Sequence, residues 1–174
     1  MGSEMCIRDR TCSYSGDSEK FRVYDQESQP RGLAFNSDGT KMFVTGNIGD
    51  DVNEYACSTG FDVSTCSHSG DSERFSVVGQ ESSPQGLVFN TDGTKMFVVG
   101  SSGDDVNEYA CSTGFDVSTC SYSGDSERFS VVGQESSPQG LVFNTDGTKM
   151  FVVCLLYTSP SPRDLSTSRM PSSA

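Results

Sequence analysis

The chain has 174 residues and a formal net charge of −12 at pH 7, because 24 Asp and Glu face 12 Lys and Arg. This acidity argues against binding to nucleic acid, whose phosphates require a basic surface, and it disfavours binding to anionic membrane surfaces. No apolar run is long enough to span a bilayer, so we expect no membrane insertion.

Both ends of the chain differ from the sequence between them. Codons can be chosen so that the DNA for Met5–Asp9 is the reverse complement of the DNA for Cys154–Tyr157. Such an inverted repeat resembles the transposon-derived adapter used to prepare sequencing libraries. We therefore expect residues 1–10 and 154–174 to be adapter-derived tails. The alternative is a natural basic leader and a natural Ser/Pro-rich tail.

The remaining residues 11–153 form an internal repeat with a period of 54 residues, marked by Cys12, Cys66 and Cys120. Counted from these cysteines, the repeats cover residues 12–65, 66–119 and 120–153, which is about two and two-thirds units. Self-similarity at this period is typical of propellers and other arrays.

Each repeat predicts four β-strands and no helix. Short aromatic and β-branched runs bounded by Gly, Pro, Asn and Asp are typical of strands. Asp92-Gly93 predicts a tight hairpin, and the apolar run Met96–Val99 predicts a strand covered on both faces. In the second and third repeats the strands are expected at Gln85–Asn90, Lys95–Gly100, Val106–Cys111 and Arg128–Val132. A leading strand is also expected at Lys20–Tyr24.

The segment Pro30–Gly46 reads Pro-x-Gly-Leu-x-Phe-x-x-Asp-Gly-x-Lys-Met-Phe-Val-Thr-Gly. This motif resembles the YVTN- and NHL-type β-propeller repeats, and the resemblance covers residues 11–153. It implies an all-β fold, an incomplete β-propeller-like array of four-stranded antiparallel blades, with a flat solenoid as the alternative. A closed propeller needs at least four blades, so we expect a fragment whose remaining blades are missing.

Two cysteine pairs enclose the same linker in successive repeats, Cys57 with Cys66 and Cys111 with Cys120. This pattern predicts one structural disulfide per repeat, each stabilising the fold by roughly 2.5–3 kcal/mol in the chain-entropy model. Buried free thiols are the alternative. Disulfides indicate an oxidising compartment, so we expect an extracellular or cell-surface location, although no signal peptide is visible.

Two acidic pairs are weak candidates for a calcium site, Asp50 with Asp51 and Asp104 with Asp105, because hard cations bind several carboxylates. Two adjacent acids do not complete a coordination shell, so solvated loops are the alternative. If the propeller fold holds, the Asp104-Asp105 loop and the Gln80-Glu81 loop share one end of the array. That end is expected to be acidic.

The repeats argue against a catalytic site. The single histidine, His68, is replaced by tyrosine in the other two repeats, so a surface position on a strand or loop is expected. Near-identical blades repeat one side chain around an axis, whereas a nucleophile, its base and an orienting group are three different residues.

The sequence therefore predicts a non-catalytic binding or structural module of a secreted or surface protein. We expect no cofactor and a protein or carbohydrate ligand. The alternative is a fragment of a propeller enzyme such as a lactonase-like hydrolase.

Overall fold

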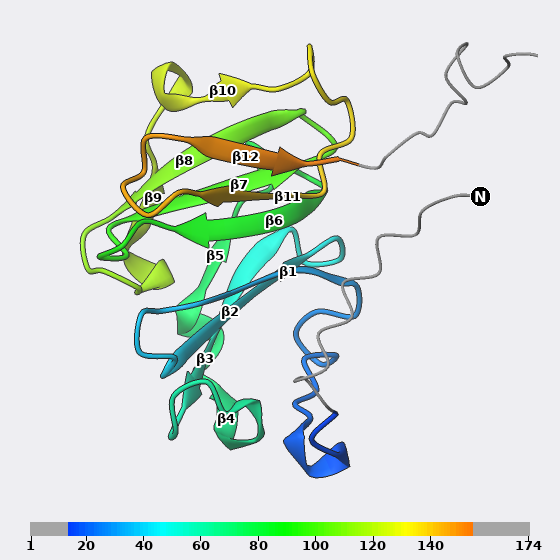
Figure 1. Cartoon of the computed structure of the whole chain (residues 1–174), viewed down its shortest axis with the longest axis vertical. Coiled ribbons are helices and arrows are strands. Elements are labelled where there is room, and N and C mark those ends of the chain that lie inside the picture. The colour runs from blue at the N-terminus through cyan, green and yellow to red at the C-terminus, as the bar shows by residue number, and fades with distance from the viewer. Residues whose placement is uncertain (1–13, 155–174) are drawn as a thin grey trace, which may run out of the picture.

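The computed structural model describes residues 14–154, in which strands alternate with turns and short 3₁₀ helices (Figure 1). The expected adapter-derived tails lie outside these residues, apart from Cys154, which is exposed. Within the described range no helix reaches the length and apolar character that crossing a bilayer requires.

The strands form three antiparallel sheets. The first sheet contains β1 (Pro30–Phe35), β2 (Lys41–Gly46), β3 (Asp51–Cys57), β4 (Cys66–His68) and β5 (Arg74–Ser76). The second contains β6 (Pro84–Phe89), β7 (Lys95–Gly100), β8 (Asp105–Cys111), β9 (Cys120–Tyr122) and β10 (Phe129–Ser130). The third contains β11 (Gly140–Phe143) and β12 (Met150–Val153). The 3₁₀ helices are η1 (Asp17–Glu19), η2 (Val63–Thr65), η3 (Asp71–Glu73), η4 (Val117–Thr119) and η5 (Asp125–Glu127).

We call the three sheets blade 1 (residues 30–76), blade 2 (residues 84–130) and blade 3 (residues 140–153). In blades 1 and 2 the first three strands form a meander, and the fourth position is shared by two short strands that both pair with the third. The expectation of all-β, four-stranded antiparallel units is confirmed. The repeat 66–119, counted from its cysteine, supplies the outer strands β4 and β5 of blade 1 and the first three strands, β6, β7 and β8, of blade 2.

The predicted fourth strand differs in detail from the structure. The sequence predicts a single fourth strand at Arg128–Val132. In the structure two short strands, β9 and β10, share the fourth position of the sheet, and η5 lies between them. Gly124 interrupts the strand with a φ of 108°, a conformation that favours glycine. The Cys111–Cys120 pairing places β9 directly beside β8 before this interruption.

The expected leading strand Lys20–Tyr24 is also wrong, since these residues belong to no sheet.

The first hairpin of each blade is closed by the predicted Asp-Gly turn. In blade 2, Gly93 has a φ of 74°, and its N–H donates to the carbonyl of Asn90 at 3.1 Å. The Asp92 carboxylate accepts the N–H of Thr94 at 3.0 Å, and the Asn90 side-chain oxygen accepts the N–H of Lys95 at 2.9 Å. The same contacts recur in the other two blades, because the turn sequence recurs.

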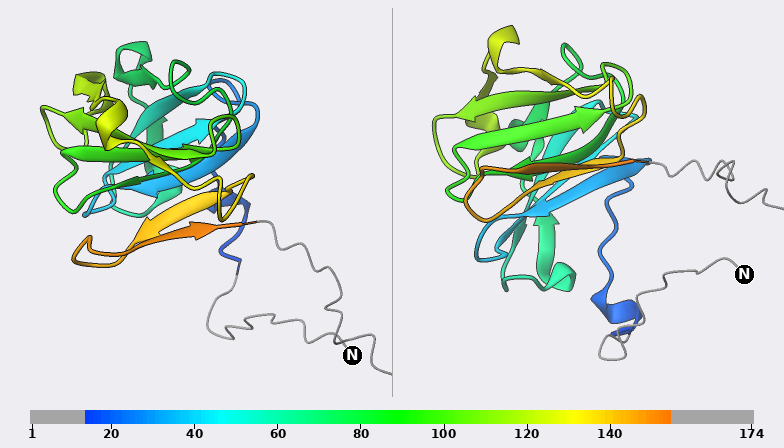
Figure 2. Two further views of the ribbon diagram at one scale, coloured as in Figure 1. Left: turned by 90° about the horizontal axis from the view of Figure 1, so that it is seen from above. Right: turned by 45° about the horizontal axis from the view of Figure 1, so that its top comes forward.

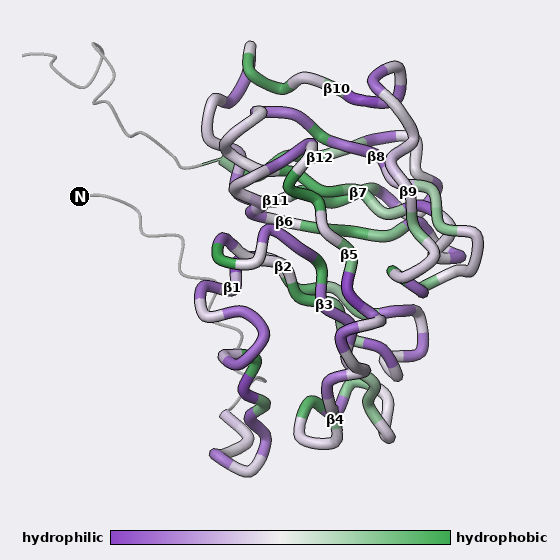
Figure 3. The backbone as a smooth tube through the Cα atoms, turned by 180° about the vertical axis from the view of Figure 1, so that it is seen from behind, coloured by the Kyte–Doolittle hydropathy of each residue, from purple (hydrophilic) through white to green (hydrophobic). Residues whose placement is uncertain are grey.

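Apolar side chains between blades 1 and 2 form the main core. Phe43 from β2 is fully buried and packs 4.6 Å from the ring of Phe89 on β6. Met96 and Val98 are also fully buried, and Phe97 is half-buried, as the uninterrupted apolar run predicts. Figure 3 shows the hydrophobic colour concentrated on strands such as β6 and β7, while the connections are mostly hydrophilic.

The first strands of the three blades approach one another closely, and β1, β6 and β11 follow one another in Figure 1. A methyl group at Gly32 would lie 2.9 Å from the Cα of Gly86, and one at Gly86 would lie 2.8 Å from the Cα of Gly140. Only glycine permits this backbone contact. Figure 2 shows the resulting arrangement, with the β11–β12 hairpin lying against blade 2.

Candidate functional site

The acidic pairs proposed from the sequence lie where a turn enters the third strand of blades 1 and 2, and Asp51 and Asp105 are the first residues of β3 and β8. Asp50 has a φ of 49° and Asp104 a φ of 53°, and one carboxylate oxygen of each is buried without a hydrogen-bond partner. Asp51 is buried and accepts the Asn53 side-chain amide at 2.7 Å. Its second oxygen lies 3.4 Å from Nε of Arg74.

Each second aspartate therefore has an arginine as its partner. Asp105 lies 3.5 Å from Arg128, in the same way that Asp51 lies beside Arg74. Burial raises the pKa of Asp51, and the Arg74 guanidinium opposes that rise. Among the described residues no third carboxylate joins either pair, and calcium binding by these four aspartates stays a prediction.

Glu81 belongs to the end of the array that is expected to be acidic, but its side chain points inward. Glu81 is 1% exposed, and its carboxylate accepts the backbone N–H groups of Ser83 at 2.7 Å, Ser102 at 3.1 Å and Gly103 at 3.0 Å. Glu27 makes the equivalent contacts in blade 1. These glutamates tie two loops together and do not contribute surface charge.

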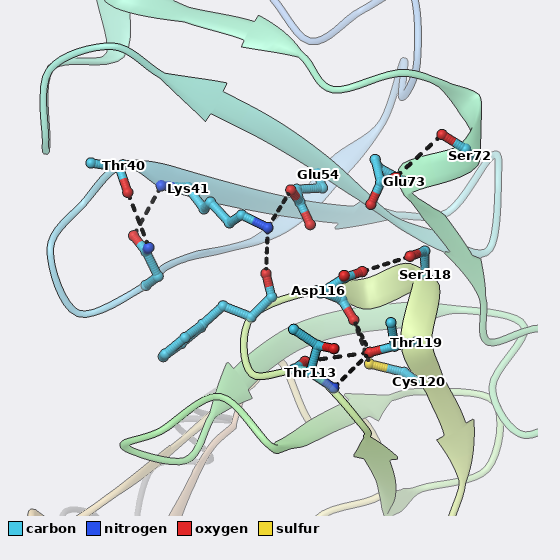
Figure 4. Close-up of polar contacts among 12 residues, drawn as sticks. Thr40, Lys41, Glu54, Ser72, Glu73, Thr113, Asp116, Ser118, Thr119 and Cys120 are labelled. Atoms are coloured by element: carbon cyan, nitrogen blue, oxygen red, sulfur yellow. Dashed lines mark hydrogen bonds and ion pairs between the residues drawn. The ribbon is translucent and has the colours of Figure 1, made fainter.

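A different set of carboxylates meets where blade 1 packs on blade 2. Glu54 from β3, Glu73 from η3 and Asp116 from the turn before η4 each place an oxygen within 4.8 Å of the others. Figure 4 shows these three side chains converging from two blades. The sequence analysis missed this carboxylate cluster, because its members come from different repeats and share no local motif.

Lys41 on β2 borders the carboxylate cluster. Its Nζ lies 2.8 Å from one oxygen of Glu54 and donates to the backbone carbonyl of Phe115 at 2.8 Å. Phe115 itself has a φ of 57° and donates its N–H to the carbonyl of Gly93 at 3.1 Å. Lys41 thus links β2 of blade 1 to the long loop of blade 2.

Glu54 is the most buried member of the carboxylate cluster. Its side chain is 4% exposed, and its Oε2 atom has no hydrogen-bond partner. Burial raises the pKa of Glu54, the Lys41 ammonium opposes this, and the negative charges of Glu73 and Asp116 add to the rise. The carboxylate cluster therefore holds negative charge at an energetic cost.

Local contacts orient the other two carboxylates. Oδ1 of Asp116 accepts the Ser118 hydroxyl at 2.6 Å, and the Asp116 carbonyl accepts the Thr119 hydroxyl at 2.8 Å. Oε1 of Glu73 accepts the Ser72 hydroxyl at 3.3 Å. Cys120 follows directly after η4 and is bonded to Cys111, which anchors this turn to β8.

Both predicted disulfides are present, Cys57–Cys66 and Cys111–Cys120. In blades 1 and 2 the two cysteines lie directly opposite one another on the third strand and the short strand that follows. Disulfides of this kind indicate an oxidising environment. His68 lies half-buried on β4, with its ring 5.5 Å from that of Tyr55.

Comparison with solved structures shows the fold. The chain is similar to a putative 6-phosphogluconolactonase from Bacteroides uniformis (TM-score 0.54, 14% identity, 79% of this chain and 38% of that chain). It is also similar to a putative 6-phosphogluconolactonase from Bacteroides fragilis (TM-score 0.52, 17% identity, 72% and 32%) and to Kuenenia stuttgartiensis hydrazine synthase (TM-score 0.50, 17% identity, 82% and 33%).

The fold is that of an open β-propeller segment. The chain spans about a third of the length of these three structures. No protein-family model matches the chain, and no curated protein matches it in sequence. At these identities the likeness concerns the fold alone.

Proposed function

We propose that residues 11–153 are a non-catalytic binding or structural module of a secreted or cell-surface protein, forming part of a larger propeller. The observation that carries this proposal is a polar rim between blades. Asn47 of blade 1 accepts the Gln85 side-chain amide and contacts the Ser83 hydroxyl, both at 3.3 Å. The Ser82 and Ser102 hydroxyls pair at 2.9 Å.

This rim is held rigid from below by Glu81, which binds backbone groups of both loops. The same inward-facing glutamate recurs as Glu27 in blade 1. A rigid polar surface of this kind suits contact with another macromolecule. We propose a protein as the partner, with a carbohydrate as the alternative. The two disulfides support a secreted or surface location.

The proposal is tested by screening the 174-residue chain against an array of secreted proteins and an array of glycans. A genuine ligand should lose at least tenfold in affinity for Ser102→Arg, which obstructs the rim. Ser112→Arg, an exposed substitution beyond the third strand, should bind as the wild type does. Equal binding by both variants would remove the rim from the proposal.

A lactonase-like hydrolase is the alternative, because two of the similar structures are described as putative 6-phosphogluconolactonases. Hydrolysis of 6-phosphogluconolactone by the purified chain, well above the uncatalysed rate, would favour the enzyme over the binding module.

A further inference from the structure

The carboxylate cluster at the junction of blades 1 and 2 takes no part in the polar rim. The geometry points to a divalent-cation site, with Glu54, Glu73 and Asp116 binding one calcium ion between the two blades. The first support is distance. Calcium lies about 2.3–2.6 Å from its oxygen ligands, so two ligands of one ion are separated by no more than about 5 Å. The three oxygens here all lie within 4.8 Å of one another.

The second support is the orphaned oxygen of Glu54. Only 4% of this side chain is exposed, and its Oε2 atom has no hydrogen-bond partner. A buried polar atom without a partner is costly. In Figure 4 one oxygen of Glu54 meets Lys41, and the other faces Glu73 and Asp116. A cation at that point would satisfy the orphaned oxygen.

The charges also balance. Three ionised carboxylates and the Lys41 ammonium sum to −2, which a single divalent ion neutralises. Lys41 is engaged by Glu54 Oε1 and by the Phe115 carbonyl, so its ammonium is held on one side of the carboxylate cluster. Glu73 and Asp116 are half-buried and leave room for water ligands.

The donor atoms select the ion. All three are carboxylate oxygens, which suit calcium, whereas zinc prefers the nitrogen and sulfur of His and Cys. Cys120 lies near the turn that carries Asp116, but its sulfur is bonded to Cys111. With three protein side chains, the affinity should resemble that of extracellular modules, with a Kd of about 10⁻⁴–10⁻³ M.

The equivalent residue Asp62 supplies a comparison within the same chain. Asp62 accepts the backbone N–H of Ser64 at 3.1 Å and caps η2. Asp116 makes no such cap contact with η4, although the two turns have the same sequence. The Asp116 carboxylate therefore has spare acceptor capacity where the other two carboxylates meet it.

The test measures calcium binding to the 174-residue chain and to matched amide variants. Wild type is expected to bind about one calcium ion by isothermal titration calorimetry. Its Tm should rise by about 4 °C in about 10 mM CaCl₂, compared with NaCl of equal ionic strength. The NaCl reference removes the screening effect expected for an acidic chain. Asp116→Asn and Glu73→Gln should each lose the heat signal and the Tm rise.

The controls are the same substitutions at the sister positions, Asp62→Asn and Glu127→Gln, which should keep the full calcium response. These residues occupy the repeat positions of Asp116 and Glu73, but among the described residues neither completes a set of three carboxylates. An equal response in all four variants would overturn the proposal, because it would reflect nonspecific binding. The absence of any heat of calcium binding in folded wild type would also overturn the proposal. In that case a proton shared between carboxyl groups would satisfy the Oε2 atom of Glu54.

Discussion

The ring of Phe75 meets the ring of Tyr109 edge-on, with the centroids 5.3 Å apart and the planes at 76°. Phe75 lies on the outer strand of blade 1, and Tyr109 on the third strand of blade 2. Phe21 and Tyr55 repeat this contact, again at 5.3 Å and 76°. The segment before blade 1 thus packs on blade 1 in the way that β5 packs on blade 2, although it forms no strand.

This regular packing leads to a first prediction about two equivalent leucines. Leu87 is 5% exposed because blade 1 covers it, whereas Leu33 is 58% exposed on the outer face of blade 1. Leu87→Ala should lower the free energy of unfolding by about 2–4 kcal/mol, and Leu33→Ala by less than about 1 kcal/mol. Urea denaturation measures both. Equal losses would mean that the blades do not pack as described.

A second prediction concerns the contact between first strands. Gly86→Ala should destabilise the protein by at least about 2 kcal/mol, because the new methyl group would collide with the backbone at Gly140. Gly133→Ala has no heavy atom within 4 Å of its new methyl group and should be neutral or slightly stabilising. Thermal melting of the two variants distinguishes these cases.

A third prediction concerns the inward-facing glutamate. Glu81→Gln should lower the free energy of unfolding by about 2–4 kcal/mol, since hydrogen bonds from three backbone N–H groups to the two oxygens of a charged carboxylate are weakened or lost. Glu127→Gln, at an exposed position, should change stability by less than about 0.5 kcal/mol. A mild effect at Glu81 would indicate that these loops are held by other contacts.

A fourth prediction concerns the disulfides. The chain has seven cysteines, and four of them are bonded to one another. Thiol titration of the denatured, unreduced chain should therefore find at most three thiols, rising to seven after reduction. Replacing Cys57 and Cys66 together with serine should cost roughly 2.5–3 kcal/mol. Seven thiols before reduction would contradict the pairing.

A fifth prediction concerns pH in calcium-free buffer. Burial raises the pKa of Glu54 above its usual 4.5, with Lys41 opposing and Glu73 and Asp116 adding to the rise. As pH rises above about 4.5, the Glu54 carboxyl loses its proton in the unfolded chain before it does so in the folded chain. The free energy of unfolding therefore falls until the carboxyl has also ionised in the folded chain.

Glu54→Gln should remove this part of the fall, leaving the contribution of Asp51, whose pKa burial also raises. Urea unfolding measured between pH 4 and pH 8 tests the difference. An unchanged pH profile in the variant would show that Glu54 does not titrate in this way.

The sequence alone determined the features that lie within one repeat. Three such features depend on residues close together in the chain: the Asp92-Gly93 turn, the apolar run Met96–Val99 and the disulfide between Cys111 and Cys120. Their geometry follows from strand alternation, turn conformation and short loop length. These local rules were sufficient for the first three strands of a blade and their antiparallel order, but not for the fourth strand, which is divided into two short strands.

Only the tertiary structure decided what happens between repeats. Glu54 and Asp116 belong to different blades, and nothing in their local sequence indicates that they meet. Glu81 is surrounded by polar loop residues, yet it is buried because two loops fold over it. Such contacts depend on the angle and distance at which one sheet packs on the next, which arise from the summed packing of many side chains and from the close approach of Gly32, Gly86 and Gly140.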